Sequence, residues 1–298
     1  MKSIRVYHVD AFTTTKFGGN PAGVVLDGAH LDEQQMQQIA NELNLSETVF
    51  LLPAEDAAAD YRVRYFTPSN EVDFCGHATV GISWILATEP GVAQLDDGVK
   101  LQTNIGIIPV RWIKQDGQVT QVEMTQAAPA IRQPEIDVER LSRGIGIPVQ
   151  QLDTTYPIQL GYTGNWHLLV PVIHRAAIDE AKPDLNDLAQ YNRELGVITT
   201  HLFTGTAEQH SQIYTRDFAP AIGIAEDPVT GSANGALMAY LYLNGLIDQQ
   251  QPSLIEIRQG DMIGRGGTLY ATVEPTGASA IVRMAGSAVV SLRGVMEL

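Results

Sequence analysis

The stretch Glu71-Val72-Asp73-Phe74-Cys75-Gly76-His77-Ala78-Thr79-Val80-Gly81 decides the fold that we predict for this chain. A second stretch, Glu226-Asp227-Pro228-Val229-Thr230-Gly231-Ser232-Ala233-Asn234-Gly235, shows the same order of features. Each follows a Phe-x-Pro turn, begins with acidic residues, and passes through a glycine and a small polar or imidazole side chain. Because the motif occurs once in each half of the chain, the sequence predicts an internally duplicated fold.

Each motif opens a segment of helical length that is apolar on nearly every side, over residues 78–87 and 233–243. A helix that is apolar all round is buried. The remaining segments are mostly β-rich, and a sheet can bury such a helix only by curling around it. We therefore predict an α+β fold of two pseudo-symmetric domains, each a curled mixed β-sheet, or half-open barrel, around a central apolar helix.

The domain boundary is predicted from the proline-containing segment 129–134. It gives an N-terminal domain over residues 1–128 and a C-terminal domain over 129–298, with the last strand free to pack back on the first domain. Within the first domain, Asp32 is predicted to cap a helix that Asn44 ends.

Composition excludes several classes of function. The formal charge of −15 argues against a nucleic-acid partner or an anionic membrane surface, since phosphates are bound by clustered Lys and Arg. No run is long and apolar enough to span a membrane, and the N-terminus lacks a signal-peptide pattern, so we expect a cytoplasmic protein.

The single cysteine, Cys75, excludes an intramolecular disulfide and a Cys-based zinc site. The histidines show no paired metal-ligand spacing, so we predict neither a metal nor an organic cofactor.

Gly76 and Gly231 stand where a buried helix begins. The first N–H groups of a helix have no partner within it, and together with the helix dipole they attract an anion. One such turn is more often a plain helix start, and each polar residue in it has an ordinary structural explanation. The repetition favours a functional site in which the two helix starts hold a ligand carboxylate from two sides. His77, Asp227 and Ser232 are the polar residues of the two repeated turns.

The sequence resembles the PhzF-like proteins, named for the phenazine-biosynthesis isomerase, within the diaminopimelate-epimerase fold group. The resemblance extends over essentially the whole chain. It rests on motifs that occur in the family's order: Val9-Asp10-Ala11-Phe12, Gly19-Asn20-Pro21-Ala22-Gly23-Val24, Leu45-Ser46-Glu47-Thr48-Val49-Phe50, Tyr65-Phe66-Thr67-Pro68, Cys75-Gly76-His77-Ala78-Thr79 and Glu226-Asp227-Pro228-Val229-Thr230-Gly231-Ser232-Ala233.

This resemblance implies an active site between the two domains, without a cofactor, and is compatible with a homodimer. It makes Glu47 the proton-transferring acid/base. The residues that it places around Glu47, in catalysis or substrate binding, are Asn20, Gly76, His77, Asp227, Gly231 and Ser232.

We therefore expect a cofactor-independent isomerase that moves a proton between carbons of a small unsaturated carboxylic acid. A useful general base has a pKa near the working pH, so Glu47 is expected in a cleft that disfavours its charge. His77 and Asp227 would orient the substrate or relay a proton.

Two alternatives stay open. The first is a one-carbon epimerase or racemase in which Glu47 works with a second base, Asp227 or His77. A two-thiol racemase is unavailable, because Thr230 stands where the second thiol is expected, and the role of Cys75 is left open. The second alternative is a non-catalytic protein that binds a small acid.

Overall fold

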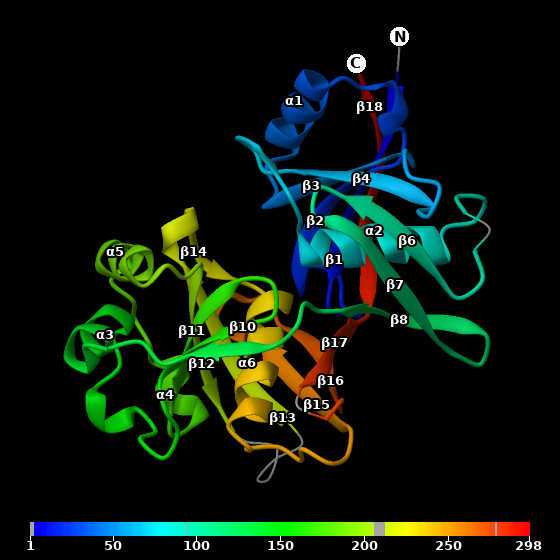
Figure 1. Ribbon diagram of the computed structural model, residues 1–298. Helices are drawn as coiled ribbons and strands as arrows, with labels where there is room; N and C mark the ends of the chain where they lie inside the picture. Colours follow the sequence, from blue (N-terminus) through cyan, green and yellow to red (C-terminus); the bar gives the residue numbers. More distant parts are fainter. Residues whose placement is uncertain (1–2, 94, 206–211, 278) are drawn as a thin grey trace. The chain divides into compact units, whose positions relative to one another are not determined.

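The computed structural model describes residues 3–93, 95–205, 212–277 and 279–298, and the chain divides into two compact units (Figure 1). The first unit comprises Met1–Thr125 together with Ala285–Leu298, and the second comprises Gln126–Met284. The segment 129–134, which we predicted as a linker, contains a strand that pairs within the second unit. The last strand belongs to the first unit.

The first unit is a mixed sheet with the strand order β18, β1, β2, β3, β4, β6, β7, β8. All neighbours are antiparallel except β2–β3 and β4–β6, and the short β5 pairs with β4. The strands are β1 Ser3–Ala11, β2 Asn20–Val25, β3 Glu47–Pro53, β4 Tyr61–Phe66, β5 Glu71–Val72, β6 Gly98–Thr103, β7 Gly106–Gln115, β8 Gln118–Thr125 and β18 Ala288–Glu297.

The second unit repeats this pattern. Its strands follow the order β9, β10, β11, β12, β13, β15, β16, again antiparallel except for two parallel pairs, β11–β12 and β13–β15. The short β14 pairs with β13 as β5 pairs with β4. The strands are β9 Ala130–Arg132, β10 Gln159–Tyr162, β11 Trp166–Pro171, β12 Thr199–Thr204, β13 Gln212–Ala219, β14 Ile224–Asp227, β15 Ser253–Gln259 and β16 Gly267–Pro275. Strand β17, Ala280–Gly286, begins in the second unit, and its last two residues are assigned to the first. The duplication predicted from the two motifs is thus present in the pairing of the strands.

In each unit, one helix follows the short strand in which the repeated motif begins. Helix α2 (Gly76–Thr88) follows β5 and contacts β1, β2, β3, β6, β8 and β18, and helix α6 (Gly231–Leu243) follows β14 and contacts β9, β10, β11 and β16. Both are buried on nearly all sides, as their apolar composition predicts. The other α-helices are α1 Glu33–Leu43, α3 Val138–Ile145, α4 Arg175–Asp179 and α5 Leu185–Leu195.

Helix α1 begins and ends where the sequence predicts. The Asp32 side chain accepts a hydrogen bond from the Gln35 backbone N–H in a capping box, and Asn44 ends the helix in the left-handed conformation. This end positions the short connection into β3. None of the helices among the described residues is long and apolar enough to cross a bilayer.

Gly161 marks a close approach between β10 and α6. A Cβ at this position would lie 2.6 Å from the Ala236 carbonyl oxygen and 2.7 Å from Leu169 Cδ1. Gly161→Ala is therefore expected to lower the free energy of unfolding by about 1–3 kcal/mol, because the helix and strand would have to separate. Denaturant unfolding measures the change.

Gly144→Ala is the matched control. Gly144 lies within α3, and the nearest atom to its Cβ would be 3.6 Å away. Removing a glycine from a helix stabilises by about 0.5–1 kcal/mol, so the two substitutions should act in opposite directions. Equal effects of the two would contradict the tight packing of β10 on α6.

Candidate active site

Glu47, Cys75 and His77 are brought together by the packing of the first unit. Glu47 is the first residue of β3, and the parallel register of β2 and β3 places it beside Ala22. Cys75 is the N-cap of α2, and His77 lies in the first turn of that helix. Two segments that are separate in sequence therefore place an acid, a thiol and an imidazole side by side.

The imidazole of His77 is the centre of this cluster. Its Nε2 atom lies 3.2 Å from Glu47 Oε2 and 3.3 Å from Ser46 Oγ, and its Nδ1 atom lies 3.5 Å from Cys75 Sγ. The contact with Glu47 has the distance of an ion pair without the alignment of a hydrogen bond. Ser46 also donates a hydrogen bond to the Pro21 carbonyl oxygen at 3.3 Å, which anchors the loop before β3 to β2.

The cluster is largely buried but reaches solvent. The side chains of Glu47 and His77 are 16% and 11% exposed, and Cys75 is 7% exposed. A Cβ at Gly76 would meet no atom nearer than Met124 Cε at 4.0 Å, so there is open space beside the start of α2. A small ligand can therefore approach the first N–H groups of the helix, which attract anions.

The charges of the cluster follow from its contacts. Burial acts to raise the pKa of Glu47, but the contact with His77 and its charge outweigh burial and hold that pKa below its usual value. Burial acts to lower the pKa of His77, but Cys75 and Glu47 outweigh it and raise that pKa well above its usual value. Burial raises the pKa of the Cys75 thiol. These shifts favour the carboxylate form of Glu47, the imidazolium form of His77 and the uncharged thiol of Cys75.

This result corrects one expectation. We expected Glu47 in surroundings that disfavour its charge. Burial does act in that direction, but the imidazolium of His77 compensates the carboxylate and stabilises it.

The same three side chains are the group that could offer three ligands to a metal ion. Within the described parts of the chain, ligand atoms of Glu47, Cys75 and His77 all lie within 4.8 Å of one another. The set mixes a hard oxygen with a soft sulfur. The ion pair between Glu47 and His77 accounts for their closeness without a metal.

The other predicted residues lie elsewhere in the two units. Asn20 is the first residue of β2, is fully buried and pairs with Ala11 in the sheet. Asp227 ends β14, and Gly231 and Ser232 open α6 after the N-cap Thr230. The Thr230 hydroxyl donates a hydrogen bond to Asp227, and both have further partners among buried polar residues of the second unit.

Ser46 was not singled out by the sequence as a member of the site. It directly precedes Glu47 in the family motif, which was the one available signal. Thr230 has two buried polar partners, Asp217 on β13 and Gln259 on β15. The sequence gave no signal for them, because they lie in strands without a recognisable motif.

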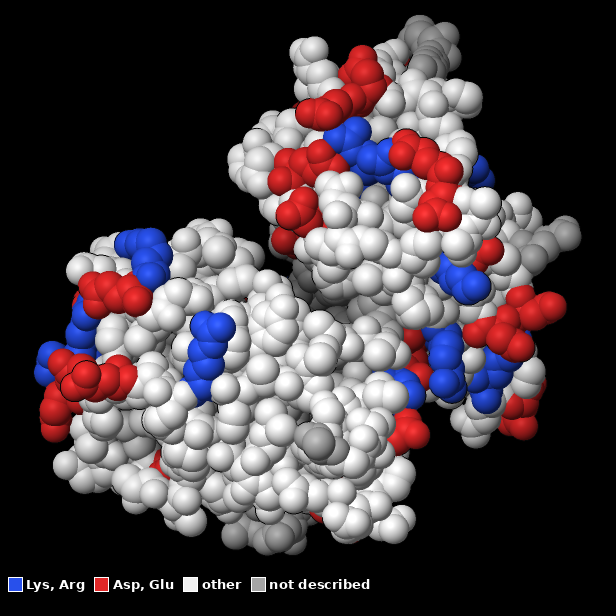
Figure 2. Space-filling model, viewed as in Figure 1, with Lys and Arg blue, Asp and Glu red and all other residues white. Residues whose placement is uncertain are grey.

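Surface charge forms no uniform basic patch on the face that Figure 2 shows, where blue and red atoms mostly lie side by side. Arg64 contacts Glu71 at 2.6 Å and Glu33 at 2.9 Å, and Arg293 contacts Glu89. The arginines of these pairs are thus engaged by acids.

Comparison with known proteins gives a consistent result over the whole chain. Residues 9–294 match the family model described as phenazine biosynthesis-like protein. An uncharacterised isomerase of Bacillus subtilis is 34% identical over 100% of both chains. A trans-2,3-dihydro-3-hydroxyanthranilate isomerase of Pseudomonas chlororaphis is 35% identical over 89% of each chain. The crystal structure of a phenazine biosynthesis protein of the PhzF family from Bacillus anthracis superposes with a TM-score of 0.90 at 33% identity, covering 100% of both chains.

The ion pair predicts how His77 titrates. Because a raised pKa in the folded state stabilises the fold below the unfolded pKa, His77 stabilises the protein at low pH and loses this effect as pH rises through its folded pKa. Glu47→Gln removes the carboxylate that contributes to this shift. We expect NMR of the histidine ring nitrogens to show that His77 loses its proton at lower pH in the variant than in the wild type.

Glu42→Gln is the matched control, because Glu42 is exposed on α1. It should leave the titration of His77 unchanged. A His77 that titrates at the same pH in the wild type and in Glu47→Gln would contradict the ion pair.

Proposed function

The chain belongs to the phenazine biosynthesis-like family and is an isomerase, and we propose that it moves a proton between two carbons of a small unsaturated carboxylic acid, with Glu47 as the acid/base. The family and the enzyme class predicted from the sequence motifs are confirmed. The substrate class and the role of Glu47 are our proposal.

The observation that carries the proposal is the contact of 3.2 Å between Glu47 and His77 beside the open start of α2. The imidazolium keeps Glu47 ionised and so able to accept a proton. When Glu47 takes a proton from carbon, the charge of His77 loses its counter-ion. The protonated Glu47 is thereby disfavoured, which favours return of the proton to another carbon of the substrate.

A carboxylic acid suits this site on electrostatic grounds. The N–H groups at the start of α2 and the charge of His77 both attract an anion. The relative from Pseudomonas chlororaphis is named for a dihydro-hydroxyanthranilate, which is a small unsaturated acid. We propose a substrate of the same chemical kind, whose conjugation spreads the negative charge that develops when the proton leaves carbon.

The proposal extends to the architecture and to the second unit. Each unit would be a half-open barrel that curls around its apolar helix. Asn20, Gly76, Gly231 and Ser232 would bind the substrate, and Asp227 would assist it through its carboxyl group. The repeated helix start, with its free N–H groups, supports this assignment.

A one-carbon epimerase is the second candidate, because a thiol lies beside Glu47 and His77. In that mechanism a second group returns a proton to the same carbon from the opposite side. The raised pKa of Cys75 argues against the thiol as this base.

Glu47→Gln should lower kcat/KM by at least about 100-fold, because a positioned general base contributes about 10²–10⁴-fold. Steady-state kinetics with trans-2,3-dihydro-3-hydroxyanthranilate or a related small unsaturated acid provide the measurement. Glu42→Gln should keep the wild-type rate. Full turnover by the Glu47→Gln protein would show that another residue moves the proton.

Cys75→Ala should retain kcat within about tenfold of the wild type, because an uncharged thiol is a poor base at neutral pH. Its pH profile should change only through the pKa of His77. Loss of activity in Cys75→Ala, restored by no other small residue at this position, would favour a mechanism in which the thiol exchanges the proton.

A further inference from the structure

The carboxyl group of Glu47 has a buried oxygen that no hydrogen bond satisfies. Among the residues that the structure describes, Glu47 Oε2 has no hydrogen-bond partner. Its contact with His77 Nε2 at 3.2 Å has the distance of an ion pair only. A buried acceptor without a hydrogen bond costs free energy, and a group that is left in this state needs an explanation, such as a role in catalysis.

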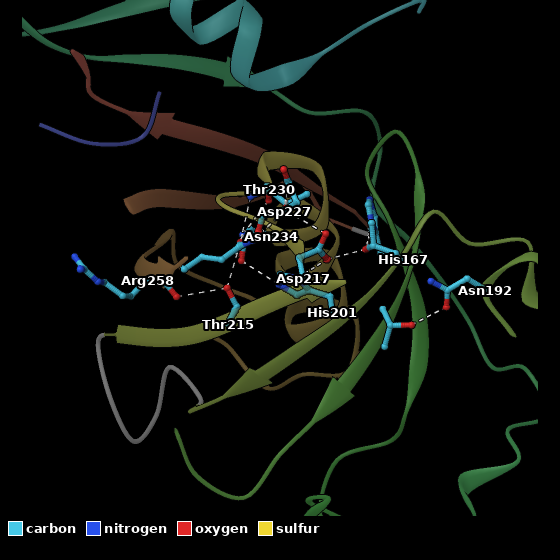
Figure 3. A network of polar contacts seen from close by, with 12 residues as sticks. His167, Asn192, His201, Thr215, Asp217, Asp227, Thr230, Asn234 and Arg258 are labelled. Carbon is cyan, nitrogen blue, oxygen red and sulfur yellow. Dashed lines mark hydrogen bonds and ion pairs between the residues drawn. The ribbon is translucent and has the colours of Figure 1, made fainter. Parts of the chain in front are cut away.

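Asp217 in the second unit shows how a buried carboxyl group is ordinarily satisfied (Figure 3). This residue is fully buried, and its carboxyl group accepts hydrogen bonds from the hydroxyls of Thr199 at 2.7 Å and Thr230 at 3.1 Å. Nδ1 of His201 lies 2.8 Å away. The same scaffold can therefore surround a buried acid with hydrogen-bonding side chains, and it does not do so at Glu47 Oε2.

The hydroxyl of Ser46 accounts for the difference. It has one proton, which it donates to the Pro21 carbonyl oxygen at 3.3 Å. Its oxygen also lies 3.3 Å from His77 Nε2. Because the hydroxyl proton is already used, Ser46 can only accept in this second contact, so Nε2 carries a proton and donates it to Ser46. The imidazolium form, which the raised pKa of His77 favours, has this proton in place.

The Nε2 proton of His77 therefore goes to Ser46 and not to Glu47. The contact with Ser46 has the geometry of a hydrogen bond, and the contact with Glu47 does not. Cys75 Sγ lies nearer to Nδ1, at 3.5 Å, than to Nε2, at 3.8 Å, so the thiol belongs to the other side of the ring. The ring thus places a positive charge beside Glu47 without a hydrogen bond to it.

This arrangement suits a group that takes up and returns a proton. A hydrogen bond to a carboxylate favours its charged form and weakens it as a base. Such a bond would also be lost each time Glu47 is protonated. A fixed charge stabilises the carboxylate without occupying a lone pair and without moving during the reaction. After burial and His77, Ser46 and Cys75 make smaller contributions to the pKa of Glu47.

We propose that Ser46 is a positioning residue, which binds the Nε2 proton of His77 and thereby leaves Glu47 without a hydrogen bond from the ring, as a stronger base. That Glu47 is the base rests on the proposed function, whereas the hydrogen bond from His77 to Ser46 does not. Ser46 acts through His77 and needs no contact with the substrate. Its hydroxyl therefore contributes to kcat rather than to KM.

NMR of protein labelled with ¹⁵N in histidine tests the hydrogen bond without a substrate. In Ser46→Ala the Nε2 proton of His77 is free to turn to Glu47, and its signal should move downfield, because charged acceptors form shorter and stronger hydrogen bonds. The substitution Glu47→Gln should shift this signal strongly in the Ser46→Ala background and much less when Ser46 is present. An equally strong response to Glu47→Gln in both backgrounds would overturn the proposal.

Ser291→Ala is the matched control. Ser291 donates the same kind of hydrogen bond, to the His8 carbonyl oxygen at 3.3 Å, between β18 and β1. Its loss should leave the signal of His77 in place. A signal that moves equally in Ser291→Ala and Ser46→Ala would show a general effect of the lost hydroxyl and overturn the proposal.

Kinetics test the contribution to the reaction. Ser46→Ala should lower kcat at least about tenfold and leave KM within about threefold, because the loss falls on a base that contributes about 10²–10⁴-fold. Ser46→Thr keeps a hydroxyl and should retain most of kcat, and Ser291→Ala should match the wild type. A raised KM with unchanged kcat in Ser46→Ala would show that Ser46 only anchors its loop to Pro21, and would overturn the proposal.

The two readouts separate this proposal from the proposed function. The expected NMR result in a protein that turns over no small unsaturated acid would leave the hydrogen bond to Ser46 standing and defeat the proposed function. Turnover that depends on Glu47 in a protein whose Nε2 proton is bound to Glu47 would do the reverse.

Discussion

The burial of α2 on nearly all sides is the constraint on which the site depends. A helix packed against strands from so many positions of the sheet cannot shift along its axis without loss of many contacts. Its first turn is therefore held in place, with Cys75, Gly76 and His77 in fixed positions. The register of β2 and β3 brings Glu47 to the same point. The ion pair of Glu47 and His77 thus results from packing rather than from local sequence.

The duplicated strand pairing carries different chemistry in its two copies. In the first unit the helix start carries a thiol and an imidazolium beside a carboxylate. In the second unit the helix start carries small hydroxyl residues above a buried network that includes Asp217 and His201.

Sequence reasoning found the elements that local patterns determine. The apolar helices and the capping of α1 by Asp32 and Asn44 follow from residues within one segment. Sequence reasoning missed the features that depend on which distant segments pack or pair with one another. The ionised state of Glu47 depends on contact with a helix start far along the chain. Asp217 belongs to the network because β13 pairs with both β12 and β14, and the predicted linker contains β9 because its residues pair with β10.

The most direct test of the central claim is the position of deuterium after turnover in heavy water. The measurement uses trans-2,3-dihydro-3-hydroxyanthranilate or a related small unsaturated acid with the wild-type enzyme, and NMR locates the label in the recovered product. A single acid/base at Glu47 predicts that the double bond migrates and that any deuterium taken up from solvent appears at the carbon that receives the proton. Deuterium at the carbon that lost the proton, with inversion there and no migration of the double bond, would contradict the account.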